Sequence, residues 1–264
     1  MIDKLPSSIY AISKLPEAEK TAIFRQLIPD WVFQQYNIDP GTLLQDGKKV
    51  VYLRCPDGSR SMELSVRYHP YELDPLTYMN MIDTFNHQLM VLLVIVNDPE
   101  SPRYNVDVDL EGHSTYFGTR GRNIPEEIRA MNAGLAPGQI RRGLRAFRST
   151  IPLFEDFVSR MGHDLFLIEP LSYHNAIVFE RYGFAYTHGK SEMERIHREF
   201  QPGGSLYEWL DDSNPFRQTR CWNSISGRSW AIHDGILGHP YTGFQMYKRI
   251  GKHAEVNTFP DSRW

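Results

Sequence analysis

The sequence lacks several features that would narrow its class. Only two cysteines, Cys55 and Cys221, occur in 264 residues, which excludes a disulfide framework. The formal net charge of −3 provides no overall field that would attract nucleic acid or an acidic membrane. The longest apolar run, Leu89–Val96, is too short to span a bilayer, and the first residues have no basic stretch ahead of an apolar core. We therefore expect a folded cytoplasmic protein without nucleic-acid or membrane partners.

The first hundred residues combine turn signals with apolar segments. Two β-rich segments, Val50–Cys55 and Met62–Tyr68, flank a Pro-Asp-Gly-Ser turn and predict a β-hairpin. Asp74 is a good helix cap and predicts a helix over Pro75–Asn86. The continuous apolar run Leu89–Val96 has the length and branched residues of a fully buried strand.

A row of acidic residues follows this run. Alternation over Tyr104–Leu110 predicts a half-buried strand, and Asp107, Asp109, Glu111 and His113 would share one of its faces. Such a row could hold a hard cation or, with the histidine, a transition metal. The solvated face of a strand is the simpler interpretation, and we favour it.

The pattern becomes α/β after residue 138. A helix beginning at Gln139, a short buried strand His163–Glu169 and a second helix Leu171–Tyr182 follow one another, and Phe184 opens a further strand. Helices that alternate with short buried strands are typical of an α/β domain.

Two motifs bound this segment. Gly138–Leu144 has the sequence Gly-Gln-Ile-Arg-Arg-Gly-Leu, and Phe179–Phe184 has the sequence Phe-Glu-Arg-Tyr-Gly-Phe at the end of the second helix. Together they resemble the acyl-CoA-binding segment of the GNAT N-acetyltransferase family. Members of that family have a glycine-bearing pyrophosphate loop, a helix, a strand and a second helix that ends close to Tyr-Glu-Lys-Leu-Gly-Phe.

The resemblance implies a GNAT-like α/β (α+β) fold, with a mixed, mostly antiparallel central sheet flanked by helices. It implies a single domain over residues 1–264, with a long insertion at 111–137 and a loop-rich C-terminal extension at 187–243. In this family two strands splay apart to seat the pantetheine arm of the coenzyme, and Tyr104–Leu110 and His163–Glu169 are expected to be those strands.

The resemblance also implies the chemistry. The co-substrate would be acetyl-CoA or another acyl-CoA, with no metal, and the acyl group would pass by direct attack to an amine of a small molecule or protein. Backbone amides at a helix start and nearby side chains would bind the pyrophosphate. These cofactor-binding residues are Gly138, Gln139, Arg141, Arg142, Gly143 and Leu144. A carboxylate, Glu111 or Asp109, would take the proton of the amine.

Three residues depart from the family pattern. Ile140 replaces the usual Gln or Arg, and Arg145 replaces a second glycine. Phe179 occupies the position of the tyrosine that many members use as general acid. A phenylalanine cannot donate a proton to a departing thiolate, so another group or water would have to do so.

Two other functions remain open. The chain could be a non-catalytic GNAT-like module that binds a small molecule or a protein through its aromatic C-terminal third. It could also be a metal-dependent enzyme that uses the Asp107–His113 face of the expected strand. A homo-oligomer is compatible with each of these functions.

Overall fold

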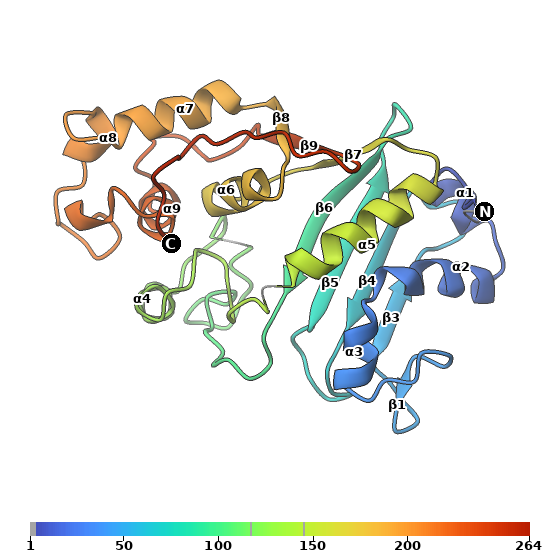
Figure 1. Cartoon of the computed structure of the whole chain (residues 1–264). Helices are drawn as coiled ribbons and strands as arrows, with labels where there is room; N and C mark the ends of the chain where they lie inside the picture. Colours follow the sequence, from blue (N-terminus) through green and yellow to red (C-terminus); the bar gives the residue numbers. More distant parts are fainter. Residues whose placement is uncertain (1–3, 117, 145) are drawn as a thin grey trace. The chain divides into compact units, whose positions relative to one another are not determined.

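The computed structural model describes residues 4–116, 118–144 and 146–264 (Figure 1). The chain forms two compact units. Unit 1 comprises Met1–Glu100, Gly143–Glu169 and Tyr247–Lys252, and unit 2 comprises Ser101–Arg142, Pro170–Met246 and His253–Trp264. Neither unit is a continuous stretch of sequence, so a change in composition along the chain could not have separated them.

Seven strands are hydrogen-bonded in the order β3-β4-β5-β6-β7-β9-β8. Their bounds are β3 Val51–Arg54, β4 Ser61–Val66, β5 Thr77–Asp83, β6 Leu89–Val96, β7 Leu165–Ile168, β8 Ala185–His188 and β9 Gln245–Arg249. The pairs from β3 to β6 are antiparallel, and β6 pairs with β7 in parallel. The mixed α/β class with a mostly antiparallel sheet is therefore confirmed, as is the β3–β4 hairpin. A separate small hairpin joins β1, Leu44–Gln45, to β2, Lys48–Lys49.

Helices pack on the sheet within unit 1 (Figure 1). They are α1 Ile9–Ser13, α2 Glu17–Phe24, η1 Arg25–Leu27, α3 Asp30–Gln35 and α5 Phe147–Arg160. In α5 the buried Phe154, Phe157 and Val158 lie at the i, i+3, i+4 spacing of one helix face. Phe154 packs edge-on against Phe166 of β7 at 4.7 Å between ring centroids. Phe157 contacts Phe24 of α2 at 6.3 Å, so α5 joins the sheet to the N-terminal helices.

Helices provide most of the regular secondary structure of unit 2, which contains much of the segment expected to be loop-rich. Its helices are α4 Ile124–Asn132, α6 Tyr173–Arg181, α7 Lys190–Glu199, α8 Ser205–Glu208, η2 Thr219–Cys221 and α9 Ile225–His233. The core of this unit centres on Trp230 of α9, which is 1% exposed and stacks on Phe216 at 5.4 Å. The indole nitrogen donates to the carbonyl of Leu135 at 2.8 Å, so the large ring is buried without losing its hydrogen bond.

The helix predicted over Pro75–Asn86 is wrong, because β5 occupies Thr77–Asp83. The backbone N–H of Leu76 donates to Val66 at 2.8 Å and begins the ladder with β4. Strand β5 is paired on both edges, to β4 and to β6. These long-range pairs outweigh the capping signal of Asp74, which is purely local.

Two predictions beside the resembling segment are also wrong. Tyr104–Leu110 is not a strand but a series of turns. Its apolar alternation does not mark one buried face, since Val106 is buried whereas Leu110 is 80% exposed. The helix expected from Gln139 begins later, at Phe147.

Candidate functional site

Strand β6 extends beyond its short parallel contact with β7. Among the described residues, Met90 and Val91 of β6 pair with β7, whose last residue is Ile168, and β6 continues to Val96. The register of β6 with β5 shifts at the next position, where Leu92 has no partner between the pairs Val91–Met81 and Leu93–Asn80. A single extra residue of this kind is a β-bulge, which bends the strand and changes the direction of its edge. Beyond the bulge, Leu93–Val96 follows β5 and has no pairing to β7 among the described residues.

The separated half of β6 is apolar and half-buried. The run Leu89–Val96 was expected to be fully buried, but Leu92–Val96 is only partly covered within the chain. Five consecutive aliphatic side chains beside an unpaired strand edge supply both apolar contact and backbone hydrogen-bonding groups. This combination suits an extended ligand that carries amide groups.

Gly143 lies at the end of β6. A Cβ on this glycine would stand 3.3 Å from the carbonyl oxygen of Val96, so a larger side chain would crowd the strand end. The chain then enters α5, whose N-cap residue, Ala146, has no capping side chain and whose first turn has no acidic residue. Arg148 is exposed in that turn. The start of α5 therefore carries the positive end of the helix dipole together with an arginine. Arg145, which replaces the second glycine of the family pattern, lies outside the described residues.

The predicted cofactor-binding residues are divided between the two units. Gly143 and Leu144 belong to unit 1, and the others belong to unit 2. Gln139 accepts a hydrogen bond from the N–H of Ala136 at 2.7 Å. The Gln139 side chain therefore bonds to the backbone of its own unit. The side chains of Arg141 and Arg142 do the same.

Arg141 and Arg142 both fasten the loop to Ser101. The Arg141 guanidinium donates to the Ser101 carbonyl at 2.7 Å, and the backbone N–H of Arg142 donates to the Ser101 hydroxyl at 3.1 Å. The guanidinium of Arg142 donates to the carbonyl of Ala133 at 2.9 Å. Gly138 has a φ of +79°, which suits glycine in the turn before this loop.

The predicted catalytic carboxylates lie in a turn of unit 2. Asp109 Oδ1 accepts hydrogen bonds from the N–H groups of Glu111 and His113, each at 2.9 Å. These backbone bonds, that from His113 above all, hold the pKa of Asp109 below its usual value. Glu111 has an 80% exposed side chain, 3.5 Å from the His113 ring. Of the two carboxylates, Asp109 is the one that accepts these backbone hydrogen bonds.

Two other residues considered in the sequence, Phe179 and Asp107, contact neighbouring side chains of unit 2. Phe179 is 6% exposed, and its ring centroid lies 5.2 Å from that of Phe184. Asp107 is paired with Arg103 at 2.7 Å. In the described part of the chain, no group of three His, Cys, Asp or Glu residues is arranged to hold a metal ion. Across the same residues, no helix has the length and apolarity to cross a membrane.

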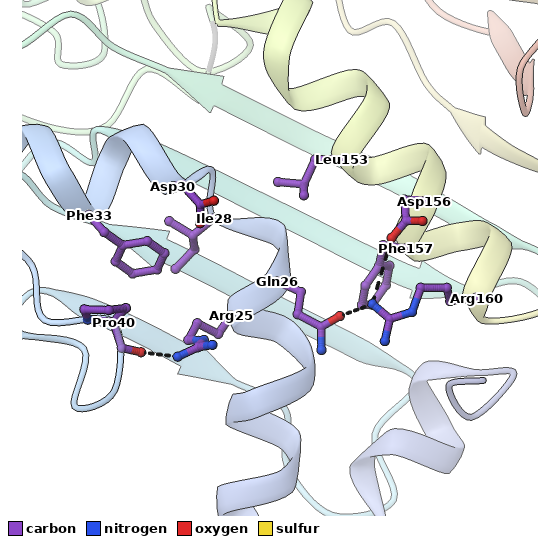
Figure 2. A pocket seen from close by; sticks show the side chains of 10 residues that line it. All are labelled: Arg25, Gln26, Ile28, Asp30, Phe33, Pro40, Leu153, Asp156, Phe157 and Arg160. Carbon is purple, nitrogen blue, oxygen red and sulfur yellow. Dashed lines mark hydrogen bonds and ion pairs between the residues drawn. The ribbon is translucent and has the colours of Figure 1, made fainter. Parts of the chain in front are cut away.

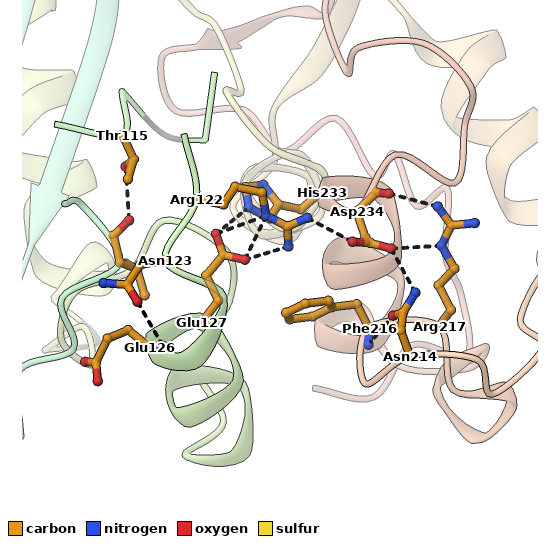
Figure 3. A network of polar contacts seen from close by, with 11 residues as sticks. Thr115, Arg122, Asn123, Glu126, Glu127, Asn214, Phe216, Arg217, His233 and Asp234 are labelled. Carbon is orange, nitrogen blue, oxygen red and sulfur yellow. Dashed lines mark hydrogen bonds and ion pairs between the residues drawn. The ribbon is translucent and has the colours of Figure 1, made fainter. Parts of the chain in front are cut away.

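A buried ion network in unit 2 was not anticipated from the sequence (Figure 3). Glu127, with a 4% exposed side chain, accepts from Arg122 at 2.5 Å and lies 3.1 Å from the His233 ring nitrogen. Arg122 also pairs with Asp234 at 2.8 Å, and Asp234 pairs with Arg217 at 2.9 Å. Burial raises the pKa of Glu127, but the bonds from His233 and Arg122 outweigh it and lower the pKa overall. The pairs Glu127–His233 and Arg122–Asp234 join residues 106 and 112 positions apart in sequence, so no spacing could have revealed them.

Unit 1 also has a hollow between η1 and the C-terminal half of α5 (Figure 2). Its volume is about 480 Å³, and its walls include Phe33, Leu153 and Phe157. The arginines at its rim are already bonded, Arg160 to Gln26 and Arg25 to the Pro40 carbonyl, each at 2.5 Å. The hollow is therefore less equipped to bind an anionic coenzyme than the start of α5.

The edge of Leu93–Val96 that no strand pairs with among the described residues, together with Gly143 and the start of α5, is the candidate site of unit 1. It combines an unpaired strand edge, apolar side chains and a positive helix end. A scan against protein-family models and searches of curated proteins and of solved structures find no match.

Proposed function

We propose that the chain is an acyl-CoA-dependent N-acyltransferase with a GNAT-like fold, and that its coenzyme binds along the unpaired edge of Leu93–Val96 in β6. The observation that carries the proposal is the two-pair parallel contact of β6 and β7, followed by the bulge at Leu92. The resemblance implies strands that splay apart to seat a pantetheine arm. The splayed strand we propose is β6, in place of Tyr104–Leu110.

The order of elements supports the same proposal. Antiparallel strands, a glycine-bearing loop, a helix, a strand and a second helix follow one another as β3–β6, the loop at Gly143, α5, β7 and α6. Pantetheine carries amide groups, and the free edge of Leu93–Val96 offers N–H and C=O groups at extended spacing to pair with them. The start of α5 and Arg148 would attract the pyrophosphate.

The reaction we propose is direct attack by an amine on the thioester carbonyl carbon. A C–N bond forms, the C–S bond breaks, and the amine loses one proton while the CoA thiolate gains one. Of the two carboxylates that the resemblance implies as bases, Glu111 is the one we propose, because backbone bonds lower the pKa of Asp109 and weaken it as a proton acceptor, and Glu111 is tested below independently of the coenzyme site of unit 1. Since Phe179 cannot protonate the thiolate, water is the proposed proton donor.

Calorimetric titration with CoA tests the site. We expect binding by the wild-type chain and about tenfold weaker binding by Gly143→Val, because its methyl groups would push Val96 away. Gly41→Val is the matched control, since Gly41 also has an ordinary φ and meets only the Asp39 side chain at 3.4 Å. If the wild-type chain does not bind CoA, the proposal fails.

Arg148→Gln tests the contribution of charge at the start of α5. The substitution removes an attraction for the pyrophosphate, and we expect a several-fold weaker binding of CoA with a smaller dependence on salt. Arg198→Gln, on an exposed position of α7, is the control and should bind as the wild type does. Equal affinities of the two variants would remove Arg148 from the site.

Release of free thiol from acetyl-CoA in the presence of an amine panel tests the chemistry. Glu111→Gln should lower kcat by about a hundredfold, the contribution of a general base. Glu19→Gln, an exposed carboxylate in the first turn of α2, should not change it. CoA binding without thiol release from any amine would instead favour the non-catalytic module.

A further inference from the structure

The hollow between η1 and the C-terminal half of α5 has a partly apolar wall (Figure 2). Ile28, Phe33 and Phe157 line it and are buried, and Leu153 beside them is half-buried. Its volume of about 480 Å³ lies within the range of small-molecule sites. All its lining residues belong to unit 1. The wall therefore favours a small ligand with an apolar part.

Four charged residues line the same hollow, and their signs balance. They are Arg25, Asp30, Asp156 and Arg160. Arg160 donates to Gln26 and lies 3.9 Å from Asp156, so these groups already contact one another. Because the lining has no net charge, it gives neither a simple cation nor a simple anion a general electrostatic advantage.

Arg25 and Asp30 are the charged groups of the lining that keep bonding capacity. Arg25 donates through Nη1 to the Pro40 carbonyl, and this bond uses only one of the five N–H groups of a guanidinium. Asp30 opens α3, and among the described residues its carboxylate has neither a hydrogen bond nor an ion pair. The two residues make no ion pair with each other in the described part of the chain, although they line one hollow. A group of N–H donors and a carboxylate thus border the hollow separately.

A zwitterion matches two opposite charges that are held apart. Its carboxylate can accept from the remaining N–H groups of Arg25 while its ammonium group donates to Asp30, and both bonds are charge-assisted. An apolar substituent on the same molecule can pack on Phe33 and Leu153. An α-amino acid with a large apolar side chain carries these three parts on one carbon atom, and a small one would leave the apolar wall in contact with water.

We propose that the hollow binds a free α-amino acid with a large apolar side chain, such as leucine or phenylalanine, at a site that does not depend on acyl transfer. Arg25 binds the carboxylate and Asp30 binds the ammonium group. Phe33, Leu153 and Phe157 contact the apolar side chain. No bond of the amino acid is made or broken, so the hollow is a binding site and not a second reaction centre.

Calorimetric titration of the full chain with leucine, phenylalanine and analogues of leucine tests the proposal. 4-Methylpentanoate has the leucine skeleton without the ammonium group, and 3-methylbutylamine lacks the carboxylate. We expect leucine to bind about tenfold more tightly than either analogue, because each analogue loses one charge-assisted bond. Glycine keeps both charges without the side chain and should also bind about tenfold more weakly than leucine.

Two outcomes of these titrations overturn the proposal. One is the absence of binding by both leucine and phenylalanine. The other is an affinity for leucine no higher than that for 4-methylpentanoate, 3-methylbutylamine or glycine. The titrations contain no CoA, so they decide on this site whether or not the chain transfers acyl groups.

Two variants connect the binding to the rim of the hollow. Asp30→Asn should weaken leucine binding about tenfold and leave the affinity for 4-methylpentanoate unchanged. Arg25→Gln should weaken leucine binding about tenfold and leave the affinity for 3-methylbutylamine unchanged. Asp57→Asn and Arg60→Gln change exposed residues of unit 1 outside the hollow and should bind leucine as the wild type does.

The pattern across the analogues separates charge recognition from a loss of structure. A variant that only loosens the hollow would weaken both analogues alike, and this result would contradict the roles of Arg25 and Asp30. If Arg25→Gln fails to fold without its bond to Pro40, Asp30→Asn still decides, since it removes no hydrogen bond or ion pair of the described residues. An unchanged affinity of Asp30→Asn for leucine contradicts the proposal.

Discussion

At the scale of single residues, the buried carboxylate of Glu127 is expected to contribute to the stability of unit 2. Glu127 is 3% exposed, and Arg122 and His233 both contact its carboxylate. Glu127→Gln keeps the shape but removes one of the two carboxylates that pair with Arg122, so we expect unfolding to be easier by about 3 kcal/mol in urea denaturation. Glu194→Gln, whose carboxylate pairs with Lys190 at 3.3 Å on the surface, is the control and should cost under about 1 kcal/mol. A loss as small as that of the control would show that the network contributes little.

His174 predicts a dependence of stability on pH. Burial lowers its pKa from 6.5 to about 3, so the folded chain keeps this ring neutral where the unfolded chain protonates it. Stability from this group is therefore complete above pH 6.5 and is lost as the pH falls towards 3. The expected slope is about 1.4 kcal/mol per pH unit for one proton.

Urea denaturation at pH 7.5, 6.5 and 5.5 measures the effect of His174 before most carboxylates titrate. His174→Gln should flatten the curve by about one proton's slope in this range. Glu127 has a lowered pKa as well, but its contribution is lost only as the pH falls below the ordinary value of 4.5, so it does not change the slope between pH 7.5 and 5.5. An unchanged slope in the glutamine variant would mean that His174 is protonated in the fold.

At the scale of elements, the Phe179–Phe184 motif acts as a helix stop. Gly183 has a φ of +82° after α6, and a Cβ there would meet His253 at 2.7 Å. Gly183→Ala should therefore cost clearly more than the roughly 1 kcal/mol of the left-handed backbone alone. Gly134→Ala measures that backbone cost, since its φ is +79° and no atom lies within 4 Å of the added Cβ. If urea denaturation shows equal losses of stability for Gly183→Ala and Gly134→Ala, the His253 side chain moves aside without cost.

The elements that the sequence predicted correctly are those with a local cause. The hairpin follows from its turn residues, and the apolar run Leu89–Val96 is a strand, β6. The wrong predictions concern segments whose structure depends on contacts with residues distant in sequence. Thr77–Asp83 is a strand because β4 and β6 pair with both its edges. Val106 is buried by the Trp230 core, which no alternation within Tyr104–Leu110 could have shown.

The candidate site could be predicted only in part for the same reason. The motif placed a glycine loop before a helix, and Gly143 does precede α5, although α5 begins eight residues after Gln139. The sequence predicts the splayed strand at Tyr104–Leu110, because that segment is the nearest before the loop. The pairing on which we base the proposal for β6 involves residues more than 70 positions apart, Met90 with Leu167, and so cannot be found in a single sequence. The same holds for Asp30 and Leu153, which line one hollow.

At the scale of the whole molecule, the division of the chain predicts how it unfolds. The chain passes between the units five times, and the segment Tyr247–Lys252 of unit 1 is bounded on both sides by residues of unit 2. Unfolding one unit therefore releases segments that anchor the other. We expect one cooperative transition rather than two.

Tryptophan placement makes this expectation measurable. Trp31 belongs to unit 1, and the other four tryptophans belong to unit 2. In Trp31→Phe all indole fluorescence comes from unit 2, whereas far-ultraviolet circular dichroism reports both units. The two transitions should coincide, and CoA, which we propose binds in unit 1, should shift both by about 2.7 kcal/mol at a hundredfold excess over its Kd. If CoA moves the dichroism transition and leaves the fluorescence transition in place, the units unfold independently. If the transitions coincide without CoA and neither moves with it, the cooperativity stands and the coenzyme site in unit 1 does not.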